Sequence, residues 1–286
     1  MERTIIRKQT TTHELICGDA LKFLDEIPPG SVNLVFADPP YNIGKEFGLL
    51  YKDLPEDEYI KWCKEWLEKI HKVLADDGSF YVMAATQFMP YIDIELRKMF
   101  HVLNRIVWFY DSSGVQAKQR FGSLYEPILL CVKNEKKYTF NYESIAVPAR
   151  TGAVRRLIDH RKKPPQQYSL TRNPGNVWYF PRVRFRMPEY LGHPSQKPEL
   201  LMERIILTSS NVGDIILDPF AGTFTTNAVA LKLRRNSIGI EIEPKYFEVG
   251  AKRVQAATEG GTIANKNNYG RTPQAIYLYQ FRRRIR

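Results

Sequence analysis

The sequence predicts an α/β fold in which helices cover both faces of an open, mostly parallel sheet. Short apolar runs alternate with segments in which apolar residues recur every three or four positions, an alternation typical of parallel sheets with crossover helices. A long stretch rich in Pro, Arg and aromatic residues divides this pattern into two halves. With 286 residues, of which 43% are hydrophobic and 26% charged, the chain can form one large domain with an insert.

The first half, residues 14–137, begins with a strand and has its strongest helical signal from Glu56 onward. Trp62 and Trp66 share one apolar face of this helix, and we expect them to lie in the core. We expect Gly78 to end the helix. The expected strands are 14–17, 31–37, 79–83, 105–110 and 127–132, and the other expected helices are 20–24 and 91–100.

The second half, residues 192–256, resumes the alternation. Its expected helices are 198–209, 225–233 and 244–254, and its expected strands are 214–217 and 236–240. Between the halves, residues 138–191 carry turn signals such as Lys163-Pro164-Pro165 and predict an irregular insert. Residues 257–286, which are rich in Gly and Asn, predict a loose, basic C-terminal extension.

Positive charge is concentrated in the insert. Residues 150–186 contain ten Lys or Arg and one acidic residue, Asp159, and carry +9 of the formal net charge of +11. Aromatic residues such as Tyr168 and Trp178 lie between these cations, a composition that suits a phosphate backbone with exposed bases. A solvated basic surface is the alternative. The candidates for nucleic-acid binding are Arg155, Arg156, Arg161, Lys162, Lys163, Arg172, Arg182 and Arg184.

Several classes of protein are disfavoured by composition. Cys17, Cys63 and Cys131 are far apart in apolar settings and predict neither a disulfide framework nor paired metal ligands. The five histidines also lack metal-ligand spacing, so we expect no metal. No run is long and apolar enough to span a membrane, and the polar start lacks a secretory apolar segment. We expect a soluble, cytoplasmic protein.

The most informative segment is Asp38-Pro39-Pro40-Tyr41, which follows the apolar run 31–37. It combines a carboxylate, a rigid turn and an aromatic face, and this set can hold a flat heterocycle that bears an exocyclic amine. A strand that ends in a Pro-rich turn is the alternative interpretation.

A second ligand signature lies in the other half of the chain. The 214–217 strand leads into Asp218-Pro219-Phe220-Ala221-Gly222, and the next strand ends at Glu241. In a Rossmann-like sheet, such a turn lies against the ligand, and the acid after the next strand bonds the ribose hydroxyls. The glycine pattern for a pyrophosphate is absent, so a nucleoside ligand without phosphates, such as S-adenosylmethionine, fits better. A packed turn with an incidental Glu241 is the alternative.

These motifs resemble those of the amino-methylating DNA methyltransferases of the permuted beta group. In that group the catalytic motif precedes the cofactor motif and a target-recognition insert separates them, which is the order found here. The resemblance covers roughly residues 14–256 and is closest to the orphan or modification enzymes that make N6-methyladenine. The segments that carry it are Asp38-Pro39-Pro40-Tyr41-Asn42, Tyr125-Glu126-Pro127, Asn173-Pro174-Gly175-Asn176-Val177-Trp178, His193-Pro194-Ser195-Gln196-Lys197-Pro198, Asp218-Pro219-Phe220-Ala221-Gly222 and Gly239-Ile240-Glu241.

The resemblance implies a Rossmann-like, S-adenosylmethionine-dependent fold with a circularly permuted motif order. The catalytic half would be 14–137, the target-recognition insert 138–191 and the cofactor half 192–256. The implied activity is transfer of a methyl group to the N6 amine of adenine in double-stranded DNA, by base flipping and direct in-line transfer. The family often forms homodimers, which implies that state as an option for this chain.

The resemblance also implies roles for the matched residues. Asp38 and the Pro39 carbonyl would accept hydrogen bonds from the target amine, with Pro40 fixing the turn and Tyr41 stacking on the extruded base. Glu241 would hold the cofactor ribose. The other implied cofactor contacts are Asp19 at the adenine amine, Asp218, Phe220 and Gly222 along the methionine and nucleoside, and Thr225, Thr226 and Lys197 at the carboxylate.

One position departs from the family pattern, since Phe224 stands where the family usually has a second glycine. A side chain makes the backbone less permissive there, so we expect a different local turn or a different cofactor affinity.

The residues also bear on alternative activities. Methylation of cytosine C5 needs a cysteine nucleophile, normally after proline, and no cysteine here follows proline. Cytosine N4 methylation uses the same amine chemistry, although that group more often has serine at the position of Asp38, and it remains the runner-up. RNA methylation is disfavoured by the insert and the motif order. A non-catalytic nucleic-acid-binding protein with this fold is the alternative from a different class, and intact Asp38, Tyr41 and Glu241 argue against it.

Overall fold

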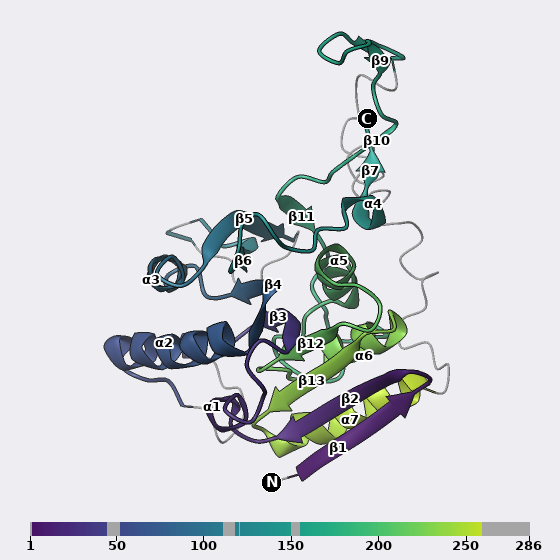
Figure 1. The fold of residues 1–286 in the computed structure, drawn as a ribbon. Coiled ribbons are helices and arrows are strands. Elements are labelled where there is room, and N and C mark those ends of the chain that lie inside the picture. The colour runs from purple at the N-terminus through teal and green to yellow at the C-terminus, as the bar shows by residue number, and fades with distance from the viewer. Residues whose placement is uncertain (1, 45–51, 111–117, 120, 150–154, 259–286) are drawn as a thin grey trace.

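The computed structural model describes residues 2–44, 52–110, 118–119, 121–149 and 155–258. These residues contain a nine-stranded sheet with helices on both faces (Figure 1). The strand order is β1 (Glu2–Lys8), β2 (Thr11–Cys17), β13 (Asn236–Glu241), β12 (Ile215–Asp218), β3 (Val32–Ala37), β4 (Leu74–Met83), β6 (Tyr125–Val132), β5 (His101–Phe109) and β11 (Val177–Tyr179). From β2 to β4 every neighbouring pair is parallel, so the predicted α/β fold with a mostly parallel centre is confirmed.

Strand alternation divides the core into two faces. Val35 and Ala37 of β3 pack with the helices of the first half, whereas Leu34 and Phe36 pack with those of the second half, because successive strand residues point to opposite faces. The first face is covered by α1 (Ala20–Phe23), α2 (Glu56–Val73) and α3 (Met89–Leu96). The opposite face is covered by α5 (Glu199–Ser209), α6 (Thr225–Lys232) and α7 (Pro244–Thr258).

The neighbouring strands β3 and β12 mark the point where the strand order reverses. From β3 the chain continues to β4 on one side, and from β12 it continues to β13 on the other. Ligands of open α/β sheets bind in the crevice outside the carboxyl ends of the strands at such a point. Asp38 directly follows β3, and Asp218 ends β12, so both predicted motifs lie at this crevice.

Several boundaries differ from the sequence-based expectation, and two differences are larger than a shift of an element's end by a few residues. The helix α2 ends at Val73, five residues before Gly78, because Leu74 adopts an extended backbone and begins β4. Leu74 is buried and pairs with Val32, and the pairing of β3 with β4 shifts register before Ser79. The strand β1 was not expected. It forms an edge hairpin with β2, and five of its seven residues are Thr, Lys, Arg or Glu, which hid its alternation.

The insert is less irregular than expected, because part of it belongs to the main sheet. The strand β11 pairs in parallel with β5, and Trp178 and the following Phe180 are buried. Tryptophan at this position therefore packs in the core and is not an exposed contact for bases. The remaining insert elements are α4 (Tyr142–Ile145), the pair β7 (Val147–Pro148) and β10 (Thr171–Arg172), and the pair β8 (Ile158–Asp159) and β9 (Gln166–Gln167).

The pairs β7–β10 and β8–β9 project away from the main sheet (Figure 1). At the other end of the chain, α7 continues to Thr258, and the predicted C-terminal extension beyond it lies outside the described residues. Among the described helices, none combines the length and the hydropathy needed to cross a bilayer.

Candidate active site

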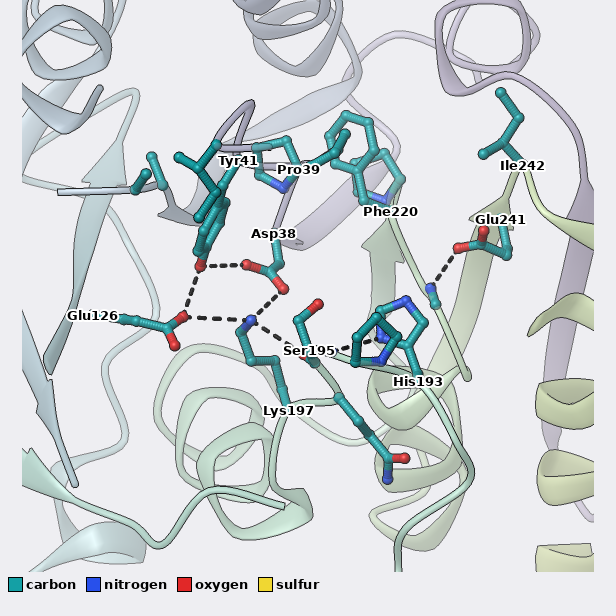
Figure 2. Close-up of a pocket in the computed structure, with 18 of the residues that line it drawn as sticks. Asp38, Pro39, Tyr41, Glu126, His193, Ser195, Lys197, Phe220, Glu241 and Ile242 are labelled. Carbon is teal, nitrogen blue, oxygen red and sulfur yellow. Dashed lines mark hydrogen bonds and ion pairs between the residues drawn. The ribbon is translucent and has the colours of Figure 1, made fainter. Parts of the chain in front are cut away.

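A cavity of about 600 Å³ lies at the carboxyl edge of the sheet, and both halves of the chain line it (Figure 2). Asp19 follows β2, Asp38 follows β3 and Glu241 ends β13. Parallel pairing brings these three carboxylates to one edge, as the positions of the motifs predict. Other residues that line the cavity are Pro39, Pro40, Tyr41, Trp62, Trp108, Tyr110, Glu126, Arg182, His193, Lys197, Phe220 and Gly222.

The turn from Asp38 to Tyr41 is held by hydrogen bonds from two directions. The Tyr59 hydroxyl of α2 donates to the Pro40 carbonyl at 2.8 Å. The Tyr41 hydroxyl lies 2.8 Å from Asp38 Oδ1 and 2.7 Å from Glu126 Oε2, and it can donate to either carboxylate (Figure 2). The turn is therefore fixed before any ligand binds.

Lys197 reaches the same group of side chains from the segment before α5. Its Nζ lies 2.5 Å from Asp38 Oδ2 and 3.5 Å from Glu126 Oε2 (Figure 2). It also donates to the Ser195 carbonyl at 3.3 Å. The family resemblance implied that Lys197 would reach a cofactor carboxylate, whereas the structure places its ammonium group against the Asp38 carboxylate.

Burial and charge act in opposite directions on these groups. Burial raises the pKa of Asp38, and the Lys197 ammonium opposes this effect. Burial lowers the pKa of Lys197, but the carboxylates of Asp38 and Glu126 outweigh it, so the pKa of Lys197 lies above its usual value. Burial and the same two carboxylates raise the pKa of Tyr41 well above 10, so its hydroxyl remains a hydrogen-bond donor at neutral pH.

The part of the cavity beside β12 and β13 is built around Glu241. Its Oε2 accepts a hydrogen bond from the Gly222 N–H and its Oε1 accepts one from the Glu243 N–H, both at 2.8 Å. Burial raises the pKa of Glu241 to about 7. Gly222 has a φ of 54°, a conformation that favours glycine, and the His193 ring packs beside it. Asp19 lines the same region while its side chain caps α1 through the Leu21 N–H.

Three residues predicted to contact a cofactor lie behind the cavity wall instead of in it. Asp218 accepts hydrogen bonds from the Phe220 N–H at 3.1 Å and the Thr226 hydroxyl at 2.6 Å. The Thr225 hydroxyl accepts one from Arg253 at 2.7 Å. All three are buried and none is among the lining residues, so in this structure they support the turn from beneath. Phe220, by contrast, lines the cavity.

Phe224 takes the left-handed backbone conformation expected of the family's glycine. Its φ and ψ are 54° and 38°, and its ring is fully buried against Phe247. Gly239 and Gly250 leave space for the ring, since a Cβ at either position would collide with it. These two glycines therefore accommodate the Phe224 side chain in this turn.

Three aromatic residues of the cavity were missed in the sequence. Trp62 was expected in the core but lines the cavity and contacts the Phe220 ring. On the other side, Trp108 and the adjacent Tyr110 form an edge-to-face pair, and the Arg182 guanidinium lies 5.1 Å from the Tyr110 ring centroid. Apolar periodicity does not distinguish a wall of a cavity from a core, so no sequence signal identified these three rings.

Glu126 was noted only as part of a motif and received no role. It is the second residue of β6, and a single acid at the start of an apolar strand is ordinarily a solvent-exposed residue. Antiparallel pairing of β6 with β4 carries it to the edge where Asp38 and Lys197 meet.

Of the predicted nucleic-acid contacts, Arg182 is partly buried at the cavity, whereas Arg161 and the others are exposed. Arg182 lines the cavity, and Arg161 forms a two-point ion pair with Asp159, with Nε–Oδ1 and Nη2–Oδ2 distances of 2.8 and 3.0 Å. The remaining candidates are exposed on the insert, and they are Arg155, Arg156, Lys162, Lys163, Arg172 and Arg184. Among the described residues, no group of His, Cys, Asp and Glu is arranged to hold a metal ion.

Comparisons with known proteins identify relatives of this chain. Residues 32–252 match the N6_N4_Mtase family, described as DNA methylase. The chain is 56% identical over 244 residues to DNA adenine methyltransferase YhdJ of Escherichia coli (strain K12), covering 85% of this chain and 83% of that protein. It is 35% identical over 250 residues to Type II methyltransferase M.HpaI of Haemophilus parainfluenzae, covering 86% and 75%.

Solved structures show the same architecture. The M1.HpyAVI–SAM complex matches with a TM-score of 0.57 and 25% identity, over 84% of this chain and 98% of that chain. The cytosine-N4-specific PvuII DNA methyltransferase matches with a TM-score of 0.67 over 90% and 97% of the two chains. At 19% identity, the second likeness concerns the fold alone.

Proposed function

Because the chain belongs to the N6/N4 DNA methylase family, we propose that it is a site-specific DNA methyltransferase that transfers a methyl group from S-adenosylmethionine to the N6 amine of adenine in double-stranded DNA. The observation that carries this proposal is the shared cavity. Asp38 and Pro39, the acceptors for an amine, line the same cavity as Asp19 and Glu241, the acceptors for a nucleoside. One cavity can thus hold a methyl donor beside a target base.

The cofactor half fits S-adenosylmethionine. Glu241 is fixed by two backbone N–H groups, which leaves its remaining lone pairs for the two ribose hydroxyls. Asp19 presents a carboxylate acceptor for an adenine amine, and Phe220 and Trp62 offer apolar surface. When bound, this cofactor supplies an activated methyl group on a sulfonium centre. The relative M1.HpyAVI, solved as a SAM complex at 25% identity, supports the same assignment.

The catalytic half is suited to activate an amine without a covalent enzyme intermediate. An exocyclic amine is a poor nucleophile because its lone pair is delocalised into the ring. Hydrogen bonds from its two N–H groups to the Asp38 carboxylate and the Pro39 carbonyl would localise and aim that lone pair. The bound cofactor would supply the methyl group for the new nitrogen–carbon bond and would be left as a neutral thioether, while Asp38 or solvent would accept the N6 proton that the amine loses. Rate would then come from positioning and electrostatics.

The target amine is inaccessible in a duplex, so the base must leave the helix, at a cost of a few kcal/mol. Tyr41, Trp108 and Tyr110 line the cavity and provide aromatic surface on which an extruded base can stack. The exposed cations of the insert and Arg182 at the cavity would hold the phosphate backbone.

The choice of adenine rests on two observations. The relative at 56% identity is a DNA adenine methyltransferase, and the catalytic turn begins with Asp38, where the cytosine-N4 group more often has serine. The N4-specific PvuII enzyme shares the fold at only 19% identity, and cytosine N4 is the competing outcome of the test below.

The test uses the full chain with methyl-labelled S-adenosylmethionine and a mixture of duplex DNAs, followed by digestion to nucleosides and separation. We expect label in N6-methyladenine. Label in N4-methylcytosine would contradict the adenine assignment, and absence of transfer would contradict the proposed activity. Sequencing of modified sites in DNA from cells that express the protein would then identify the target sequence.

A further inference from the structure

We propose that Glu126 is a positioning residue that receives the Lys197 ammonium when the target amine binds Asp38, so that the two carboxylates exchange one cation during each turnover. The inference rests on the proposed function and assigns a role to two residues that the mechanism above does not use.

Both oxygens of Asp38 already have partners. Oδ2 lies 2.5 Å from Lys197 Nζ, and Oδ1 lies 2.8 Å from the Tyr41 hydroxyl (Figure 2). An amine that donates to Asp38 must therefore replace one of these partners or share an oxygen with it. Of the two, the ammonium is the bulkier obstacle and the one that lies closer to the carboxylate.

Displacing a buried ammonium is costly unless another acceptor is ready. Lys197 is 7% exposed on its side chain, and an unpaired charge at such a site is strongly unfavourable. Glu126 Oε2 is 3.5 Å from the same Nζ, so a small movement of the ammonium group converts this contact into a close ion pair. The Tyr41 hydroxyl is also within hydrogen-bond distance of both carboxylates. It can therefore donate to Asp38 or to Glu126 as the ammonium moves between them.

The charges around the site are consistent with such an exchange. Two carboxylates share one ammonium, so removing the Glu126 charge leaves Lys197 with Asp38 as its only close acidic partner among the described residues. The other charged or titratable groups facing the cluster are Tyr110 after β5, Arg182 after β11 and the buried Asp218 at the end of β12. Of these, Asp218 is electrostatically coupled to Asp38 and Lys197, and Tyr110 to Glu126, Arg182 and Lys197.

A purely structural role for Glu126 makes a different prediction. If Glu126 only supported the fold of the cavity, removing Lys197 in addition would make a Glu126 variant worse or leave it unchanged. If Glu126 serves to draw Lys197 away from Asp38, then removing Lys197 removes the obstacle, and the second substitution rescues the first.

The experiment measures single-turnover methyl transfer against pH for the wild type, Glu126→Gln, Lys197→Met and the double variant. For Glu126→Gln we expect a rate lower on the order of 10²-fold, with cofactor and DNA dissociation constants within about twofold of the wild type. The Lys197 charge lowers the pKa of Asp38 and the Glu126 charge raises it. The acid limb of the profile should therefore move to higher pH in Lys197→Met and to lower pH, or out of range, in Glu126→Gln.

The decisive comparison is made at about pH 9, at the alkaline end of the profile, because high pH favours the ionised form of Asp38 in every variant. There the double variant should transfer methyl groups faster than Glu126→Gln. Glu126→Asp, which keeps the charge, should lose less activity than Glu126→Gln and provides a second test if the glutamine variant folds poorly. Lys64→Met and Glu68→Gln, which remove an exposed ion pair of α2, are matched controls and should leave the profile unchanged.

The two proposals fail in different ways. Absence of transfer by the wild type would contradict the proposed function itself. Transfer by the wild type together with a double variant as slow as Glu126→Gln, or with acid limbs that move in the same direction, would contradict the cation exchange alone.

Discussion

Glu241 Oε2 accepts a hydrogen bond of 2.8 Å from the Gly222 N–H, which joins the end of β13 to the turn after β12. The contact uses one lone pair of the Glu241 carboxylate. Burial raises the pKa of this group to about 7. The protonation state of Glu241 therefore changes near neutral pH.

Cofactor binding should depend on pH through Glu241. Ionised Glu241 can accept hydrogen bonds from both ribose hydroxyls, and protonation below about pH 7 removes part of that capacity. We expect the affinity for S-adenosylmethionine to rise roughly tenfold between pH 6 and pH 8, as measured by isothermal titration calorimetry. Glu241→Gln should bind more weakly with a much flatter pH dependence. Equal slopes in the two proteins would contradict the assignment.

Asp38 should matter for transfer and not for cofactor binding. It lies after β3 beside Lys197, whereas the nucleoside acceptors Asp19 and Glu241 follow β2 and β13. We expect Asp38→Ala to retain the wild-type dissociation constant for S-adenosylmethionine and to reduce transfer by a factor on the order of 10²–10⁴. Asp57→Ala, at an exposed acid in the first turn of α2, is the control. Near-normal turnover of Asp38→Ala would show that this carboxylate is not required.

The exposed cations of the insert should determine the salt dependence of DNA binding. Lys162 and Lys163 are exposed on the part that projects from the main sheet. We expect the double substitution to Gln to lower the slope of log affinity against log salt by about 0.9 for each phosphate that is no longer neutralised, without changing cofactor affinity. Lys252→Gln, at an exposed position of α7, should leave the slope unchanged. An unchanged slope in the insert variant would show that Lys162 and Lys163 do not contact the DNA.

The sequence was sufficient to predict the fold class and the edge of the sheet that carries the site. Apolar runs that end in Asp38 and Asp218 mark the carboxyl ends of parallel strands, and the topology of such sheets places those ends together. The contacts of Lys197 and Asp218 were harder to predict from the sequence, because the direction of a side chain depends on packing. Asp218 bonds Thr226 behind the turn, and Lys197 turns toward Asp38.

Non-local pairing accounts for the other differences. Glu126 reaches the site only because β6 runs antiparallel to β4, and β11 joins the sheet only because its aromatic residues pack there. Neither relationship leaves a local signal. Cation density likewise describes the whole insert and does not reveal that Arg182 lies at the cavity or that Arg161 is paired with Asp159.

The packing around Phe224 should make glycine, the residue that the family usually has at this position, unfavourable in this chain. Phe224→Gly would relieve a left-handed backbone worth about 1–2 kcal/mol but remove a fully buried ring, for which losses of about 3–5 kcal/mol are typical. We therefore expect net destabilisation in urea unfolding. Gly250→Ala, which places a Cβ against the ring, should cost more in the wild type than in the Phe224→Gly background. Equal costs would show that the ring does not constrain Gly250.

Asp218 and Glu241 should make the free protein less stable as pH rises. Burial raises the pKa of each to about 7 in the folded state, above the unfolded values near 4. The folded state therefore binds these protons more tightly, and the stability they contribute is complete below about pH 4 and is lost as pH rises toward 7. Each group lowers the free energy of unfolding by at most about 1.4 kcal/mol per pH unit over that range.

Asp218→Asn isolates one of the two contributions. An asparagine at this position can still accept from the Phe220 N–H through Oδ1 and can donate to the Thr226 hydroxyl through Nδ2, so both present hydrogen bonds have a counterpart. We expect the variant to match or exceed the wild-type free energy of unfolding at pH 8 and to show a smaller decline between pH 5 and pH 7. A further Glu241→Gln substitution should flatten the remaining slope. Because an Asn that failed to replace the hydrogen bonds would destabilise the protein equally at every pH, a parallel downward shift of the whole curve would contradict the protonation argument.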